Sequence, residues 1–190
     1  MHKISPGTLI ANRVLTTIKA KSAAIPDPSN IVHLQFRRFA GCPFCSLHLR
    51  AFAQRHEEII AAGIREVVVF PSTAAALLRH HGDVPFAIVP DPQGKLYTEF
   101  GIQSGGRALL NPSVLMTALP NVIRMLPNLP GIPRWGQGAL VLPADFLITP
   151  DARILACKYG AHADDQWSVD ELLMLVRRSH ELPAPIPNVE

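Results

Sequence analysis

The chain is organised around the stretch Gly41-Cys42-Pro43-Phe44-Cys45. Its two thiols lie three residues apart, between a strand-like apolar run at residues 31–39 and a helix-like run at residues 46–62. Residues three apart in the first turn of a helix have β-carbons roughly 5–6 Å apart, so a reversible disulfide between them is feasible. The spacing therefore predicts redox chemistry at the point where the strand passes into the helix.

The two cysteines are expected to play different parts. Cys42 falls at or just before the first helical residue, where unpaired backbone N–H groups and the positive end of the helix dipole favour a thiolate. Pro43 suits the first helical position, because its missing N–H would have no partner there. Cys42 is the predicted nucleophile, and Cys45, one turn in and better covered, is the predicted resolving thiol. The alternative is a pair of buried, inert cysteines.

A metal site is the second alternative, because His48 extends the pattern to Cys-x-x-Cys-x-x-His. Structural zinc takes four ligands, and no second pair occurs at comparable spacing, so zinc would need Cys157 or a distant His. We assign no metal ligand, and we expect Cys157 to be a small buried filler in a strand. Covalent haem attachment is excluded, because Ser46 stands where it requires His.

The composition predicts one soluble domain: 48% of the 190 residues are hydrophobic and 17% are charged. Three cysteines do not form the even framework of a small secreted domain, which favours a reducing compartment. We find no signal-peptide core and no run of about 18 apolar residues, and we expect a cytoplasmic protein without a membrane span. The net charge is +3, but Lys and Arg are scattered, so nucleic-acid binding is not expected.

The first half of the chain predicts a βαβ unit. A hairpin in the first 30 residues, with an arm at residues 14–19, is expected to cover a sheet edge. The unit itself consists of a strand at 31–36, a helix at 46–62 ended by Gly63, and a parallel strand at 65–70. Arg37 and Arg38 point to opposite faces of an extended segment, so at most one can lean toward the thiolate, and each by itself is expected to be a solvated cation. His48 and His56 are expected at the surface and the boundary of the helix.

The second half predicts a shorter series of elements. Ser72 is expected to cap a helix at 73–81, before a strand at 84–89 and a short helix at 96–100. Residues 103–139 are a Pro/Gly-rich inserted helical excursion, whose apolar side chains cover the active-site end, form a homodimer contact, or make a buried cluster of their own. Strands at 142–148 and 154–159 form a hairpin, a capping box opens a helix at 169–180, and residues 183–190 are expected to be a disordered tail.

In this order the elements resemble the α/β thioredoxin-like fold, with a central mixed sheet flanked by helices. Three segments carry a closer resemblance, to the peroxiredoxin-like branch of the alkyl hydroperoxide reductase and thiol-specific antioxidant family: residues 39–45, residues 84–94 and residues 142–151. The resemblance covers about residues 5 to 180 apart from the insertion. It implies a thiol-dependent enzyme in which Cys42 attacks and Cys45 resolves, without a bound cofactor. It also implies that Pro143 is the cis-proline that faces the cysteines.

The motif departs from the peroxiredoxin pattern at two places and from the thioredoxin pattern at a third. Gln35 and Phe39 stand where peroxiredoxins carry a proline and a threonine or serine, so the hydroxyl that positions a peroxide is absent. Gly41 stands where thioredoxins place a tryptophan. The residues expected to line the substrate site are Arg38, Phe39, Gly41, Pro43 and Pro143, with Arg38 available to steady a thiolate.

The leading hypothesis is a peroxiredoxin-like thiol-disulfide oxidoreductase that reduces peroxides or protein disulfides. Its electrons would come from a thiol reductant such as thioredoxin or glutathione. The competing hypotheses are a thioredoxin-fold adaptor that binds a protein partner through its insertion, without redox catalysis, and a zinc-binding module.

Overall fold

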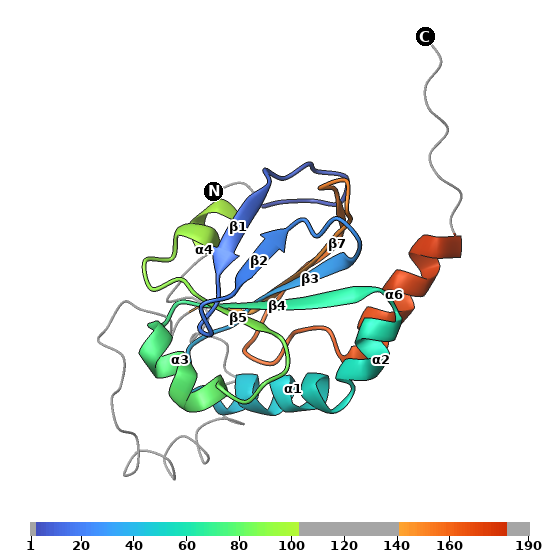
Figure 1. Cartoon of the computed structure of the whole chain (residues 1–190). Helices are drawn as coiled ribbons and strands as arrows, with labels where there is room; N and C mark the ends of the chain where they lie inside the picture. The colour runs from blue at the N-terminus through green and yellow to red at the C-terminus, as the bar shows by residue number, and fades with distance from the viewer. Residues whose placement is uncertain (1–2, 103–140, 182–190) are drawn as a thin grey trace.

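The centre of the molecule is a five-stranded mixed sheet of order β5-β4-β3-β6-β7 (Figure 1). The computed structural model describes residues 3–102 and 141–181. The strands are β3 (Ile31–Phe36), β4 (Ile64–Phe70), β5 (Ala87–Pro90), β6 (Ala144–Ile148) and β7 (Ile154–Tyr159). β3, β4 and β5 run parallel, whereas β6 is antiparallel to both β3 and β7. The predicted fold class and the predicted βαβ unit are confirmed.

Helices cover both faces of this sheet. They are α1 (Pro43–Gln54), α2 (His56–Ala61), α3 (Ala74–His81), α4 (Lys95–Glu99) and α6 (Val169–Glu181). Residues of α1, α2, α3 and α6 share one apolar cluster on one face, and α4 belongs to a second cluster on the other face. Figure 1 shows the same division, with α1 and α3 on one side of the sheet and α4 on the other. The start of α1 lies at the carboxyl end of β3.

The predicted N-terminal hairpin is present. It consists of β1 (Arg13–Thr16) and β2 (Ser22–Ile25), which pair antiparallel. The N–H of Ile18, in the turn of the hairpin, donates to the carbonyl of Ile88 in edge strand β5, 2.9 Å away. Ala23 and Ile25 are buried against the α4 face of the sheet. The hairpin therefore protects both an edge and a face, as edge strands require.

One predicted helix is two helices in the structure. The helix begins at Pro43, the first helical position that the sequence predicted, but the helical run expected to continue to residue 62 is interrupted at Arg55, whose φ of −109° and ψ of 22° are not helical. The Arg55 guanidinium binds Glu58, in α2, and Asp170, at the start of α6. The Asp170 contact is tertiary, so a periodic pattern of residues cannot reveal it. Gly63 ends α2 with a φ of 72°, as predicted.

Prolines shift the start of two predicted strands. β5 begins at Ala87, not at residue 84, and β6 begins at Ala144, not at residue 142. Pro85 and Pro143 have no N–H to give to a ladder, so the strands begin after them. The predicted insertion at 103–139 and the predicted tail at 183–190 lie outside the described residues. Within the described part, no helix has the length and apolar character needed to cross a membrane.

Candidate active site

Cys42 is the N-cap of α1, and Cys45 lies one turn further along the same helix. The Cys42 backbone is extended, with a φ of −70° and a ψ of 118°, and its carbonyl accepts from the N–H of Ser46 at 3.0 Å. Pro43 occupies the first helical position, as predicted. Cys42 leaves the strand direction through a turn in which its N–H donates to the Phe39 carbonyl at 3.1 Å. The sequence thus places one sulfur at the positive end of a helix.

The surroundings of the two sulfurs lower the pKa of Cys42 and raise the pKa of Cys45. A hydrogen bond from the Cys45 thiol, the first-turn N–H groups of Cys45 and Phe44, and the Arg38 charge outweigh burial and lower the pKa of Cys42 to about 6. Arg38 Nη1 lies 4.0 Å from Cys42 Sγ. The same hydrogen bond, together with burial, raises the pKa of Cys45 well above its usual value. Cys42 is therefore a thiolate at neutral pH, and Cys45 is the thiol that donates to it.

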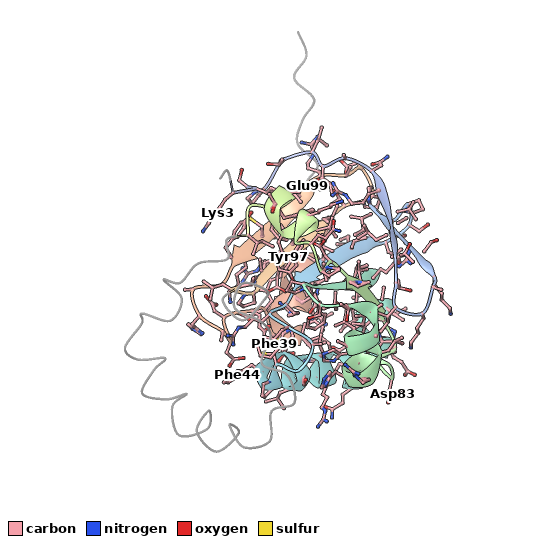
Figure 2. The ribbon with its side chains drawn as sticks, turned by 90° about the vertical axis from the view of Figure 1, so that its left-hand side faces the viewer. Lys3, Phe39, Phe44, Asp83, Tyr97 and Glu99 are labelled. Atoms are coloured by element: carbon pink, nitrogen blue, oxygen red, sulfur yellow. The ribbon has the colours of Figure 1, made fainter. Side chains whose placement is uncertain are left out.

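Both cysteines are free and buried, with exposed fractions of 0% for Cys42 and 1% for Cys45. Solvent exposure therefore does not distinguish the two sulfurs. Phe39 and Gly41 are half-buried, whereas Pro43 and Phe44 are exposed beside the motif. Figure 2 labels Phe39 and Phe44 near the start of α1. Cys42 is therefore closed to solvent in this conformation, and Phe39, Gly41, Pro43 and Phe44 are called the rim of the motif below.

The loop that precedes Cys42 is held by two side chains whose contact with it the sequence did not predict. The Ala40 N–H donates to Ser72 Oγ at 3.2 Å, and His81 Nε2 donates to the Ala40 carbonyl at 2.8 Å. Burial lowers the pKa of His81, so it stays neutral and keeps this proton on Nε2. The prediction that Ser72 caps α3 is wrong. Thr73 is the N-cap, and its side chain accepts from the Ala76 N–H.

Arg37 is fully buried beneath the motif, which corrects the expectation of a solvated cation. Its Nη2 lies 2.8 Å from Asp145 Oδ1, 2.5 Å from Gln35 Oε1 and 2.9 Å from His48 Nε2. His48 is thus also not a surface residue, and burial together with the Arg37 charge lowers its pKa to about 2. A neutral His48 accepts a hydrogen bond from Arg37. The guanidinium therefore joins the end of β3 to α1 and β6.

The buried charges continue along the sheet to His33 and Glu66. His33 Nδ1 lies 2.9 Å from Glu66 Oε1, and His33 Nε2 lies 3.2 Å from Asp145 Oδ1. Burial opposes protonation of His33, but the two carboxylates outweigh it and raise the pKa of His33 to about 9. Burial would raise the pKa of Asp145, but Arg37 and His33 lower it strongly. Two cations and two anions therefore balance within the core.

Pro143 is not a cis-proline. Among residues 3–102 and 141–181 the only cis peptide bond is Ile25–Pro26. The Pro143 carbonyl accepts from the Gly160 N–H at 2.8 Å, which continues the β6–β7 hairpin beyond the last ladder pair. Pro143 also lines a small cavity of about 90 Å³ with Lys3 and Tyr159, and neither motif cysteine lines that cavity. The expectation that Pro143 is cis is wrong, in accord with the ordinary trans preference of X-Pro bonds.

No group of three or more His, Cys, Asp or Glu side chains within the described ranges is arranged to hold a metal ion. Cys157, the third cysteine, is half-buried in β7, and its Sγ donates to the Ile4 carbonyl at 3.4 Å. Burial raises the pKa of Cys157. Cys157 is therefore a packing residue that stays a protonated thiol, whereas the pKa of Cys42 is lowered.

Comparison with known families gives one match. A model described as AhpC/TSA antioxidant enzyme matches residues 51–162, more than half of the chain. The chain belongs to the AhpC/TSA antioxidant enzyme family. This membership confirms the resemblance drawn from the sequence, and it makes the protein a thiol-dependent oxidoreductase or peroxidase. The matched residues begin after Cys45, so the cysteine motif of this AhpC/TSA member lies outside them.

Solved structures of other proteins share the fold of this AhpC/TSA member. Peroxidoxin BcpB from Mycobacterium tuberculosis is 16% identical with a TM-score of 0.66, over 93% of this chain and 98% of that one. AhpC from the same organism is 14% identical with a TM-score of 0.67, over 96% and 98%. A putative thiol:disulfide interchange protein DsbE from Chlorobium tepidum is 16% identical with a TM-score of 0.58, over 92% and 99%. No curated protein matches the sequence.

Proposed function

We propose that this protein reduces small hydroperoxides with Cys42 and then closes a Cys42–Cys45 disulfide. The observation that carries the proposal is the pair of sulfurs at the start of α1, where the Cys45 thiol donates to a Cys42 sulfur whose pKa is lowered to about 6. Thiolates, not thiols, attack peroxide oxygen, and a neighbouring thiol then resolves the product. No bound cofactor is required.

In the first step, the Cys42 thiolate attacks one peroxide oxygen and the O–O bond breaks. The other oxygen takes a proton from solvent and leaves as an alcohol, or as water when the substrate is hydrogen peroxide, and Cys42 becomes a sulfenic acid. In the second step, Cys45 sulfur attacks Cys42 sulfur, the S–S bond forms, and the sulfenic hydroxyl leaves as water with the Cys45 proton. A thiol reductant such as thioredoxin or glutathione then supplies two electrons and two protons.

The burial of Cys42 favours a small peroxide over a protein disulfide. The exposed fraction of Cys42 is 0%, so a folded partner would need a much larger opening of the rim than a two-oxygen molecule. Phe39 brings no hydroxyl to this rim, and Arg38 Nη1, 4.0 Å from Cys42 Sγ, is the cation available to a developing alkoxide. Gly41 and Pro43 flank the same sulfur along the chain. We place this cycle in the cytoplasm, where its disulfide would be reduced again.

The test compares wild type with Cys42→Ser, Cys45→Ser and Cys157→Ser. Each is assayed for reduction of hydrogen peroxide and of insulin disulfides, with thioredoxin or glutathione as donor. We expect Cys42→Ser to abolish peroxide turnover, and Cys45→Ser to stop turnover while it still forms a sulfenic acid that dimedone traps. Cys157→Ser is the matched control, and should stay within about twofold of wild type. Undiminished turnover by Cys42→Ser would refute the proposal, and faster reduction of insulin than of peroxide would make the protein a disulfide reductase.

A further inference from the structure

A cavity of about 390 Å³ lies away from the cysteine motif. Its lining comes from the turn of the β1–β2 hairpin, from α2, and from the starts of β4 and β5, and neither motif cysteine contributes to it. The start of β4 pairs with the start of β3, whereas Cys42 follows the end of β3. The six residues of β3 span roughly 20 Å, at about 3.3 Å per residue. The cavity is therefore a second concave site, at the opposite end of the strand from the reactive sulfur.

Apolar side chains form the inner wall of this cavity. The buried ones belong to the apolar cluster under α1, namely Ile18, Ile64, Phe86 and Ile88. The His56 ring, at the start of α2, also lines the cavity, and its centroid lies 5.9 Å from that of Phe86. Ile60, one turn further along α2, lines the cavity with an exposed fraction of 55%. An apolar body that filled the cavity would remove this surface from water, which is favourable.

Two lysines of the hairpin turn line the same cavity. Lys19 and Lys21 are both exposed, and no carboxylate of residues 3–102 or 141–181 forms an ion pair with either of them. The Nζ of Lys19 donates to the Val84 carbonyl at 3.1 Å, a contact that leaves its positive charge uncompensated. Each ammonium carries three N–H donors, so both have donors available for a ligand. The exposed edge of the cavity thus carries two positive charges.

The other two charged residues of the lining are already paired. Arg65 Nη1 lies 2.5 Å from Asp27 Oδ2. The Glu66 side chain is fully buried, and its Oε1 lies 2.9 Å from His33 Nδ1. These two charges are therefore balanced by partners within the protein. The two lysines supply the net charge of the cavity, and that charge favours an anion.

The turn that carries the lysines is held by its own hydrogen bonds. The Thr17 N–H donates to the Lys21 carbonyl at 2.9 Å, and the Lys21 N–H donates to Thr17 Oγ1 at 3.1 Å. Ala20 completes the turn in the left-handed region, with a φ of 55°. The Ile18 N–H joins the turn to the Ile88 carbonyl at the sheet edge, 2.9 Å away. The lysines therefore extend from a preformed frame, which is typical of small-molecule sites.

We propose that this cavity binds a small amphipathic monocarboxylate. The apolar body of the ligand lies against Ile18, Phe86 and Ile88, and its carboxylate lies at Lys19 and Lys21. A volume of about 390 Å³ falls within the range of small-molecule sites, which is about 300–1,000 Å³. Two ammonium groups without a carboxylate partner suit one acidic head group, which accepts charge-assisted hydrogen bonds from both. The proposal does not depend on the peroxide cycle, because no cysteine lines the cavity.

Isothermal titration calorimetry of the full chain with octanoate tests the proposal against two comparison ligands. Octylammonium has the same body and the opposite charge, and acetate has the same head group without the body. Two variants alter the cavity, and each has a control that makes the same change elsewhere. Lys21→Gln is compared with Lys95→Gln, at an exposed lysine of α4. Ile60→Glu is compared with Leu78→Glu, at an exposed leucine of α3 that does not line the cavity. Backbone amide chemical shifts locate the bound octanoate.

We expect one octanoate to bind per chain, roughly tenfold more tightly than octylammonium, and acetate to give no measurable binding. Lys21→Gln should weaken octanoate binding roughly twofold to fivefold, and Ile60→Glu roughly tenfold or more. The two control variants and Cys42→Ser should keep the wild-type affinity. The shifted amides should be those of residues 17–22 and 86–88.

Four results would each overturn the proposal: no saturable binding of octanoate, equal binding of octanoate and octylammonium, shifts confined to the cysteine motif, or an unchanged affinity in both cavity variants. Self-association that shields the same amides would assign the cavity to a second copy of the chain, and would overturn it as well. A failure of Cys42 to reduce peroxide would change none of these results, so the two proposals are tested separately.

Discussion

Replacement of His33 by Gln should have a destabilising effect that depends strongly on pH. His33 is fully buried, and its ring nitrogens contact Glu66 and Asp145. These carboxylates raise the pKa of His33 from 6.5 to about 9 in the folded protein. A raised folded-state pKa stabilises the fold below the unfolded-state pKa, and that stabilisation is lost as the pH rises through about 9.

The magnitude follows from the two pKa values. A rise from 6.5 to about 9, at about 1.36 kcal/mol per pH unit, contributes about 3 kcal/mol to the free energy of unfolding. Gln can hydrogen-bond but does not take up a proton, so His33→Gln removes this contribution at acid and neutral pH only. The difference between wild type and variant should therefore shrink by about 3 kcal/mol between about pH 6 and about pH 10.

Urea unfolding at a series of pH values measures this difference. It must be taken against wild type at each pH, because the lowered pKa of Cys42 changes stability in the opposite direction over the same interval. That contribution is common to both proteins and cancels. A difference between wild type and His33→Gln that varies by less than about 1 kcal/mol across the interval would refute the assignment of a protonated, buried His33.

Two further predictions concern the buried charges and the thiolate. Asp145→Asn leaves the Arg37 guanidinium buried without its carboxylate and should destabilise the protein by about 3–5 kcal/mol. The double variant Asp145→Asn/Arg37→Met should recover much of that loss. Urea unfolding of the single and double variants checks both, and strictly additive losses would contradict the pairing. Cys45→Ala removes the largest influence on the Cys42 thiolate, so the pH midpoint of iodoacetamide alkylation of Cys42 should rise from about 6; an unchanged midpoint would show that the helix start and Arg38 suffice.

Local sequence signals determined most of the scaffold. The apolar residues of β3 and the β-branched run at the end of β4 defined these strands, because such short runs are typical of strands that are covered on both faces. Ser168 and Glu171 make the reciprocal capping box that the sequence predicted at the start of α6. Gly63 ends α2 with a positive φ. The position of Cys42 at the start of a helix depends on the same short-range chemistry.

The polar network beneath the motif was missed, although its signal was present. His33 and Gln35 alternate along β3, and Arg37 follows at the same spacing, so they share one face of a strand predicted to be buried. In the sheet His33 pairs with Glu66 of β4, and Gln35 pairs with Asp145 of β6. Alternation predicts the shared face. The partners depend on the register of strands far apart in sequence, and a slip of one residue would turn every side chain to the other face.

By itself, then, the sequence determined where a reactive sulfur would stand and what fold would hold it, because helix starts, turns and strand runs are governed by neighbouring residues. Only the tertiary structure decided that Arg37 is buried, that Pro143 is trans, and that the Tyr97 hydroxyl donates to the Arg37 carbonyl. These features arise where α4, β3 and β6 meet. They are stabilised by desolvated charges and hydrogen bonds between residues dozens of positions apart, and a local sequence pattern does not predict such contacts.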